Sequence, residues 1–154
     1  MNFTIQQVSV DVILPLRDQI LIQGTNRTNP WFDDDLADST YHYAVLLQEQ
    51  VIGCVSLMQS EWEGEPAYQL RGMAIAPDHQ RLGIGRHLLA HVESKIKNMG
   101  IPLLWCNART SAIPFYEKNG WLVVSDEFDI FGVCKHVKML KPLELHAEAA
   151  CHEE

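Results

Sequence analysis

Two glycines, Gly83 and Gly85, lie between an apolar run that ends at Pro77 and a long amphipathic segment. A loop that joins a strand to the N-terminus of a helix presents backbone N–H groups that have no partner within the helix. Glycine lets these groups approach a ligand closely because it has no Cβ atom, and the helix dipole favours negative charge at that end. We therefore expect a phosphate-bearing cofactor to be held here by backbone groups.

The loop matches neither of the two common nucleotide-binding signatures. A dinucleotide-binding fingerprint needs a third glycine where this chain has Leu88, and a P-loop needs a Gly-Lys-Ser/Thr triplet that the sequence lacks. The loop by itself thus predicts an anion site without identifying the anion.

The segment after the loop is predicted to be a helix. Apolar residues recur every four positions, at Ile84, Leu88, Val92 and Ile96, and Gly100 follows as a typical helix end. The preceding strand, the loop and this helix are the elements that must position the anion site.

The rest of the chain alternates between strand and helix patterns. A helix is expected over residues 12–23, with Asp11 as its N-cap and Pro15 in its first turn, and a short helix over 111–119. Strands are expected at residues 3–10, 41–48, 51–59, 67–76, 103–108, 121–125 and 133–140, with turns at 49–50 and 60–66. This order predicts an α+β fold built on a mixed sheet.

The composition is that of one soluble globular domain, with 47% hydrophobic and 21% charged residues among 154. The net charge of −8 argues against a nucleic-acid partner and is compatible with an amine-bearing substrate. No apolar run approaches the ~20 residues of a membrane span, and no basic segment precedes the first apolar run. We therefore expect no membrane contact and a cytoplasmic location. The scattered cysteines form no CxxC pair and predict neither a metal site nor a disulfide framework.

Two blocks of sequence together resemble the GNAT superfamily of N-acetyltransferases. Residues 80–85, Gln-Arg-Leu-Gly-Ile-Gly, are similar to its acyl-CoA pyrophosphate loop, Q/R-x-x-G-x-G/A. Residues 107–121 are similar to its next block, N-A-x-x-x-A-x-x-F-Y-x-K-x-G-F/W. The chain also resembles the small bacterial ElaA/YjcF-like group, which usually has Gly-Ile-Pro-His near its end. This chain has Val-Cys-Lys-His at 133–136 and lacks the proline.

The resemblance implies the GNAT fold, in which a mixed, mostly antiparallel sheet has splayed central parallel strands and flanking helices. It implies one such domain over residues 1–143, and we expect a flexible tail over 144–154. The pantetheine arm of acetyl-CoA would lie between the splayed strands and its pyrophosphate on the loop. The implied cofactor-binding residues are Met73, Ala74, Ile75, Arg81, Leu82, Gly83, Ile84, Gly85, Arg86 and Asn107.

The resemblance also implies a general acid, because Tyr116 matches the position of the tyrosine that protonates the leaving thiolate. The resemblance does not identify the residue that acts as the general base. Many relatives carry a glutamate near the position of Gln69, and an amide cannot take a proton. The remaining candidates are Glu61, Glu63, Glu65, Asp33, Asp34, Asp35, His42 and His136, and an ordered water serves equally well. Residues 31–35 fit either a solvated loop or part of a substrate mouth.

The predicted reaction is acetyl transfer from acetyl-CoA to a primary amine by direct attack in a ternary complex. The acceptor would be a small amine or an aminoacyl or lysyl group, and the sequence does not identify it. The alternative is a non-catalytic acyl-CoA-binding or sensor module, which the missing glutamate at Gln69 supports. The sequence is compatible with a homodimer and does not determine the oligomeric state.

Overall fold

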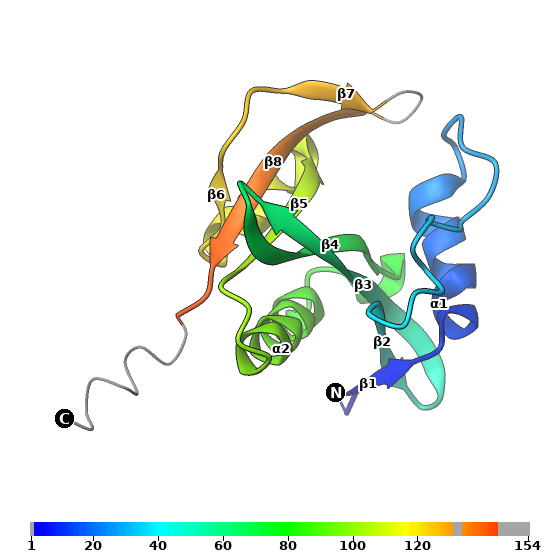
Figure 1. Cartoon of the computed structure of the whole chain (residues 1–154). Helices are drawn as coiled ribbons and strands as arrows, with labels where there is room; N and C mark the ends of the chain where they lie inside the picture. The colour runs from blue at the N-terminus through cyan, green and yellow to red at the C-terminus, as the bar shows by residue number, and fades with distance from the viewer. Residues whose placement is uncertain (1, 131–133, 145–154) are drawn as a thin grey trace.

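The computed structural model describes residues 2–130 and 134–144, which form one mixed sheet with helices on both faces (Figure 1). The strands are β1 (Thr4–Val8), β2 (Tyr41–Leu47), β3 (Gln50–Trp62), β4 (Glu65–Ile75), β5 (Leu103–Arg109), β6 (Leu122–Val123), β7 (Phe128–Ile130) and β8 (Cys134–Pro142). The helices are α1 (Val10–Arg17), the π-helix η1 (Asp18–Ile22), α2 (Ile84–Asn98), α3 (Ile113–Lys118) and the 3₁₀ turns η2 (Pro77–His79) and η3 (Thr110–Ala112).

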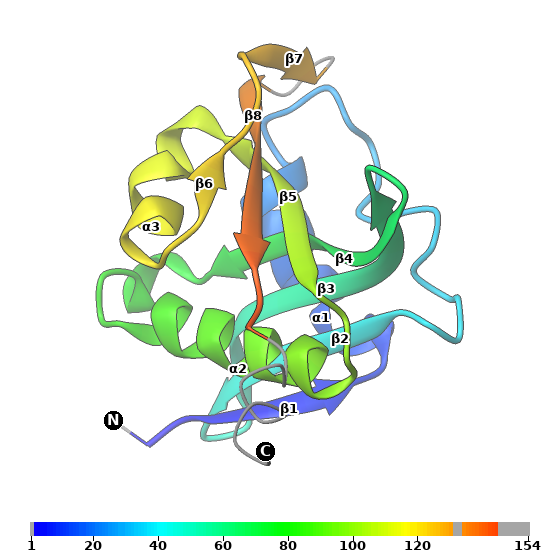
Figure 2. The ribbon, with the colours of Figure 1, turned by 60° about the vertical axis from the view of Figure 1, so that its left-hand side comes forward.

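The sheet order is β1-β2-β3-β4-β5-β8-β6, with β7 paired to β8, and every described pairing except β4–β5 is antiparallel. The parallel pairing is short: it consists of Tyr68–Leu104 and Gln69–Trp105. Beyond Gln69 the two strands separate, and in Figure 2 β5 and β8 run at a steep angle to β3 and β4. The splayed central strands of the GNAT fold are therefore confirmed.

A β-bulge interrupts β4 at the point where the strands separate. Cys54 pairs with Ala74 and Ser56 with Arg71, so Gly72 and Met73 together stand opposite a single residue of β3. Gly72 has a φ of 65°, a left-handed conformation that glycine adopts without strain. Such a bulge bends the strand and changes the direction of its side chains, here beside the opening of the sheet.

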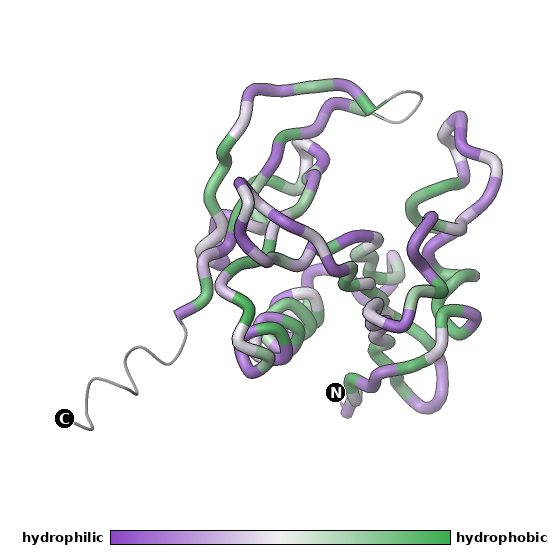
Figure 3. Tube along the Cα trace, in the orientation of Figure 1, coloured by the Kyte–Doolittle hydropathy of each residue, from purple (hydrophilic) through white to green (hydrophobic). Residues whose placement is uncertain are grey.

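The two faces of the sheet bury separate cores, because neighbouring strand residues point to opposite faces. On one face, α2 buries the predicted residues Ile84, Leu88, Val92 and Ile96. On the other face, α1 packs on Ala44, Cys54 and Ala74. Figure 3 shows hydrophobic and hydrophilic residues interleaved along α2, as expected for a helix with one buried side. Each fully buried Leu or Ile contributes about 1.5–3 kcal/mol, so α2 is fixed firmly against the sheet.

The first helix differs from the prediction. It begins at Val10 with Ser9 as its N-cap, so Asp11 lies in the first turn and Pro15 in the interior. Proline has no N–H to donate to the preceding turn. The α-helix ends at Arg17, and the chain continues as the π-helix η1.

The hairpins and late strands also differ from the predicted bounds. The β2–β3 turn lies at Gln48 and Glu49, one residue before the predicted turn, and the β3–β4 turn lies at Glu63 and Gly64, all with positive φ. The predicted 60–66 turn is thus mostly strand, since β3 runs to Trp62 and β4 begins at Glu65. The short strand β7 was not predicted. The predicted tail lies outside the described residues beyond Glu144, and no described helix is long and apolar enough to cross a membrane.

Candidate active site

Two adjoining cavities occupy the opening between β4 and β5. The first, here called the loop groove, has a volume of about 1090 Å³ and runs from the end of β4 along the 80–86 loop to α3. The second, the inner pocket, has a volume of about 200 Å³ and lies between β4, β5, β8 and the segment from η1 to Phe32. Both cavities are lined by Met73, Ser111, Ala112 and Tyr116. A molecule bound in the loop groove can therefore meet one bound in the inner pocket.

The start of α2 lies at the end of the loop groove that the sequence predicts to bind an anion. Gly83 is the N-cap with a φ of 83°, and no side chain caps the helix. The first N–H groups of α2 thus lack partners within the helix, next to the groove-lining residues Gly83, Gly85 and Arg86. A Cβ at Gly85 would lie 3.3 Å from the Phe115 ring, so this glycine also lets α3 pack closely against the loop.

Most of the predicted cofactor-binding residues line the loop groove, and three do not. Neither Leu82, which is 53% exposed, nor Ile84, which faces the core, lines the groove. Asn107 lines the inner pocket, and its Oδ1 accepts a hydrogen bond from Lys138 Nζ at 3.1 Å. The groove-lining members of the predicted set are Met73, Ala74, Ile75, Arg81, Gly83, Gly85 and Arg86.

Tyr116 lies at the junction of the two cavities. Its ring packs against Phe115 and Trp121, and its hydroxyl oxygen is 3.9 Å from Met73 Sδ. Burial raises the pKa of Tyr116 well above its ordinary value, and the neighbouring Cys106 thiol adds to the increase. Burial likewise raises the pKa of Cys106 to about 12. Tyr116 is therefore protonated near neutral pH and can donate a proton at this junction.

His136, on β8, is the candidate base that the fold brings to the inner pocket. It is only 5% exposed, and its Nδ1 lies 2.8 Å from the carbonyl oxygen of Cys134. Because a carbonyl oxygen only accepts, Nδ1 carries the proton, and Nε2 of the neutral ring is a proton acceptor. Burial lowers the pKa of His136; the Cys134 carbonyl opposes this effect, and the charge of Arg109 adds to it. The imidazole is thus neutral near pH 7.

The other candidate bases lie elsewhere or are occupied. Glu61, Glu63 and Glu65 are exposed at the β3–β4 hairpin, and Asp33 and Asp34 are exposed in the preceding loop. None of these five lines either cavity.

The remaining two candidates belong to a buried network around Arg17. Asp35 accepts hydrogen bonds from Arg17 at 2.7 and 3.1 Å and from the Phe32 N–H at 2.7 Å. His42 donates from Nε2 to the Asp35 carbonyl and accepts from the Ser56 hydroxyl at Nδ1. Both groups are fully engaged in fixing the 31–35 segment, and of that segment Phe32 reaches the inner pocket.

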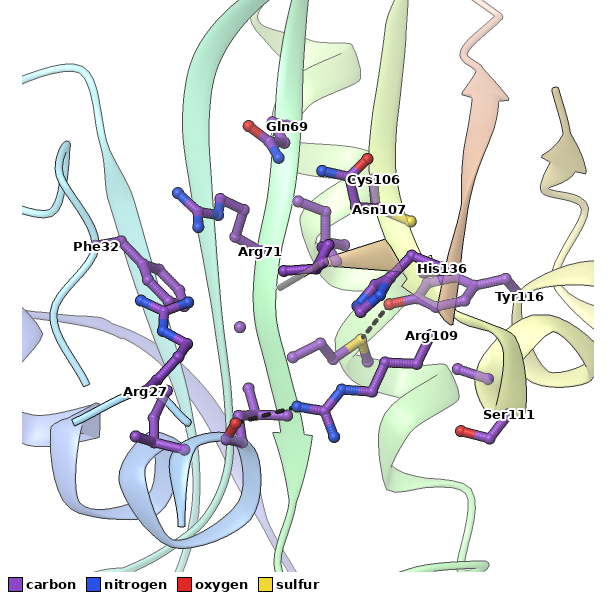
Figure 4. A pocket seen from close by; sticks show the side chains of 18 residues that line it. Arg27, Phe32, Gln69, Arg71, Cys106, Asn107, Arg109, Ser111, Tyr116 and His136 are labelled. Carbon is purple, nitrogen blue, oxygen red and sulfur yellow. Dashed lines mark hydrogen bonds between the residues drawn. The ribbon is translucent and has the colours of Figure 1, made fainter. Parts of the chain in front are cut away.

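Sequence reasoning did not select three arginines that line the inner pocket, Arg27, Arg71 and Arg109. They lie far apart in the sequence and belong to a loop, β4 and β5, so only the fold brings them together. Figure 4 shows Arg27, Phe32 and Arg71 on one side of the pocket, with His136 and Tyr116 on the other.

Residues 14–121 match the model of the acetyltransferase (GNAT) family, a span that includes both cavity-forming strands and the loop. The chain belongs to the GNAT family of acetyltransferases. This GNAT protein is 30% identical over 142 residues to the uncharacterized N-acetyltransferase YitI of Bacillus subtilis, covering 90% of this chain and 95% of YitI.

Solved GNAT structures share its fold. The crystal structure of Escherichia coli ElaA aligns with a TM-score of 0.75 at 16% identity, covering 91% of this chain and 98% of ElaA. A GNAT family acetyltransferase from Elizabethkingia anophelis, with acetyl-CoA bound, aligns with a TM-score of 0.68 at 21% identity, covering 92% and 99%. At these identities the likeness supports the fold alone, and the family assignment makes this chain an acetyl-CoA-dependent acetyltransferase.

Proposed function

We propose that this GNAT protein transfers the acetyl group of acetyl-CoA to a primary amine by direct attack in a ternary complex. The observation that carries the proposal is the pairing of a protonated phenol, Tyr116, with a neutral imidazole, His136, in one pocket that joins the loop groove.

The donor would bind in the loop groove. Beyond Gln69, no described residue pairs with the β4 backbone on the side of β5, so the amides of a pantetheine arm can pair with Met73, Ala74 and Ile75. The pyrophosphate would accept hydrogen bonds from the first N–H groups of α2, and Arg81 and Arg86 would add positive charge. A donor bound in this way would have its thioester near Tyr116, which lines both cavities.

The acceptor amine must attack as a neutral group, although a lysine-like amine has a pKa near ~10.4. We assign to Nε2 of His136 the N–H proton that the neutral amine loses as its nitrogen bonds to the thioester carbon, and after the reaction this proton returns through solvent to the Tyr116 phenolate. The amine nitrogen bonds to the thioester carbon, and the negative charge that builds on the carbonyl oxygen would be stabilised by a backbone N–H at the Gly72–Met73 bulge.

Collapse of this intermediate breaks the carbon–sulfur bond. Tyr116 gives its proton to the thiolate, which leaves as CoA, and the product is an N-acetyl amide. General acid or base help of this kind contributes about 10²–10⁴ in rate. The presence of His136 favours catalysis over the non-catalytic sensor, because it supplies the proton acceptor that Gln69 cannot.

Calorimetry with acetyl-CoA, followed by thiol release against a panel of amines, tests the proposal. We expect binding of acetyl-CoA and amine-dependent release of CoA. Binding without release for any amine would support the sensor alternative, and an absence of binding would reject both functions.

A further inference from the structure

The inner pocket is cationic, although the protein is acidic. Its lining includes Arg27, Arg71 and Arg109, and no aspartate or glutamate among the described residues lines it. The whole chain has 12 Lys and Arg against 20 Asp and Glu, so this local excess of positive charge runs against the overall composition. A pocket of this character attracts anions and repels polyamines.

None of these three arginines forms an ion pair with another described residue. The ion pairs of the described residues are Arg17–Asp35, Lys135–Asp129 and Lys141–Glu93, and none includes Arg27 or Arg71. Among the described residues, the Arg27 side chain makes one long hydrogen bond, 3.4 Å, to the Trp31 carbonyl. Since an arginine stays protonated in proteins, both guanidinium groups keep a positive charge that a bound anion can balance.

Arg71 is held in place by an aromatic ring. Its guanidinium carbon lies 4.0 Å from the centroid of Phe32, and that of Arg27 lies 5.1 Å from the same centroid. Phe32 is itself fixed, because its N–H bonds to Asp35, which is paired with Arg17. Stacking orients the guanidinium while leaving its N–H groups for a ligand.

The pKa of Arg71 reflects the charged groups that surround it. Burial lowers the pKa of Arg71, and the nearby charges of Arg27 and Arg17 lower it further, against the opposing effect of Asp35 and Asp33. Each of the two arginines thus acts more strongly on the Arg71 guanidinium than either carboxylate does.

The donor's phosphates do not account for these arginines. Arg27, Arg71 and Arg109 line the inner pocket but not the loop groove, which has its own cations, Arg81 and Arg86. Arg109 lies nearer the reacting side of the pocket: its Nη2 donates to the Leu21 carbonyl at 3.1 Å, and its charge lowers the pKa of His136. These three arginines therefore line the inner pocket, which is the space that the donor leaves open for the acceptor.

We infer that the acceptor is an anionic amine, whose carboxylate or phosphate group is bound by the guanidinium groups of Arg27 and Arg71 while its amine faces His136. This inference rests on the proposed function. The pocket volume of about 200 Å³ restricts the acceptor to a small molecule or a short chain end. Guanidinium groups bind carboxylate and phosphate in the same bidentate manner, so the two sources share one chemistry.

The experiment measures CoA release with amines that differ in one group. Alanine is compared with alaninamide, 4-aminobutyrate with 4-aminobutanamide and with 1,4-diaminobutane, and 3-aminopropylphosphonate represents a phosphate-like anion. We expect kcat/KM to be about ten- to a hundredfold higher for an anionic amine than for its neutral partner, and lowest for the diamine. The carboxylate and phosphonate arms then identify the preferred anion. Equal or higher kcat/KM for the neutral or cationic amines would overturn the inference.

Variants separate the anion site from the rest of the mechanism. Arg71→Gln should raise KM for the anionic amine about tenfold or more and leave KM for acetyl-CoA unchanged, and Arg71→Lys should recover part of the loss. Lys97→Gln removes the same charge from the far end of α2 and serves as the control. An unchanged KM for the anionic amine in a folded Arg71→Gln protein would also overturn the inference.

A failure of the proposed function is distinguishable from a failure of this inference. If no amine releases CoA, calorimetry with the same alanine, 4-aminobutyrate and phosphonate in the presence of CoA still tests the anion site. Binding of an anionic amine that is lost in Arg71→Gln supports the site without catalysis. An absence of binding by every anion overturns it.

Discussion

The phenol oxygen of Tyr116 can be removed with little effect on the fold. In Tyr116→Phe the ring keeps its contacts with Phe115 and Trp121, both at centroid distances of 5.2 Å. The lost oxygen lies 3.9 Å from Met73 Sδ and beside the Cys106 thiol, and both sulfur groups are weak hydrogen-bond partners. We therefore expect the free energy of unfolding to change by less than about 1 kcal/mol.

The effect on turnover follows from the leaving group. Positioned acids contribute about 10²–10⁴ in rate, but a thiol with an ordinary pKa of about 8.5 leaves as a thiolate more easily than most groups. We expect kcat for Tyr116→Phe to fall by about 10- to 1000-fold, which corresponds to about 1.4–4 kcal/mol in the activation free energy. Because burial raises the pKa of Tyr116, the wild-type phenol stays protonated across the neutral range and this difference should not depend on pH there.

The assay is thiol release at saturating acetyl-CoA and acceptor, with calorimetry on acetyl-CoA and thermal unfolding alongside. Tyr41→Phe is the matched control, since Tyr41 stacks on Tyr68 beneath Lys95 and lines neither cavity. A Tyr116→Phe protein with the turnover of the wild type would refute the assignment of Tyr116 as the acid.

Three further changes test the base, the bulge and the buried network. In the wild type, kcat/KM should fall as the acceptor amine becomes protonated, and it should fall more steeply below the lowered pKa of His136, because the protonated ring cannot accept a proton. His136→Gln should lose the second, steeper limb and about 10²–10⁴ in rate, and a pH–rate profile checks both points. Gly72→Ala should lower the free energy of unfolding by about 1–3 kcal/mol, measured by urea denaturation, because its Cβ would lie 3.0 Å from an aromatic ring at a positive φ. Gly64→Ala is its control, with a similar φ but open space, and an equal loss in both variants would contradict the contribution of packing. Asp35→Asn should cost about 3–5 kcal/mol in thermal unfolding by leaving Arg17 charged and buried, and a wild-type melting temperature would contradict this.

Local patterns were enough to predict the position of the glycine loop and the helix that follows it. The spacing of Gly83 and Gly85 and the four-residue repeat from Ile84 to Ile96 depend on neighbours in the sequence, and the structure places these residues as expected. The predicted start of α1 is wrong because Ser9 and Asp11 are both good N-cap residues. The choice between them depends on how the helix packs on the sheet.

The inner pocket could not be predicted in the same way. His136 was one of several candidate bases, and its selection required knowing that β8 pairs with β5. Arg27, Arg71 and Arg109 carry no local signal, since isolated arginines are usually solvated surface residues. Their convergence depends on contacts between segments that are distant in the sequence.

The short pairing of β4 with β5 leaves exposed backbone edges in the middle of a sheet, rather than at its rim. Unpaired strand edges are templates on which other chains can assemble, and most proteins cover them or keep them short. A ligand that pairs with these edges therefore acts as a removable strand and binds the folded state alone. At a hundred times its Kd such a ligand adds about 2.7 kcal/mol to the free energy of unfolding. The concentration of acetyl-CoA in the cell would then affect the lifetime of the folded protein as well as its rate of acetyl transfer.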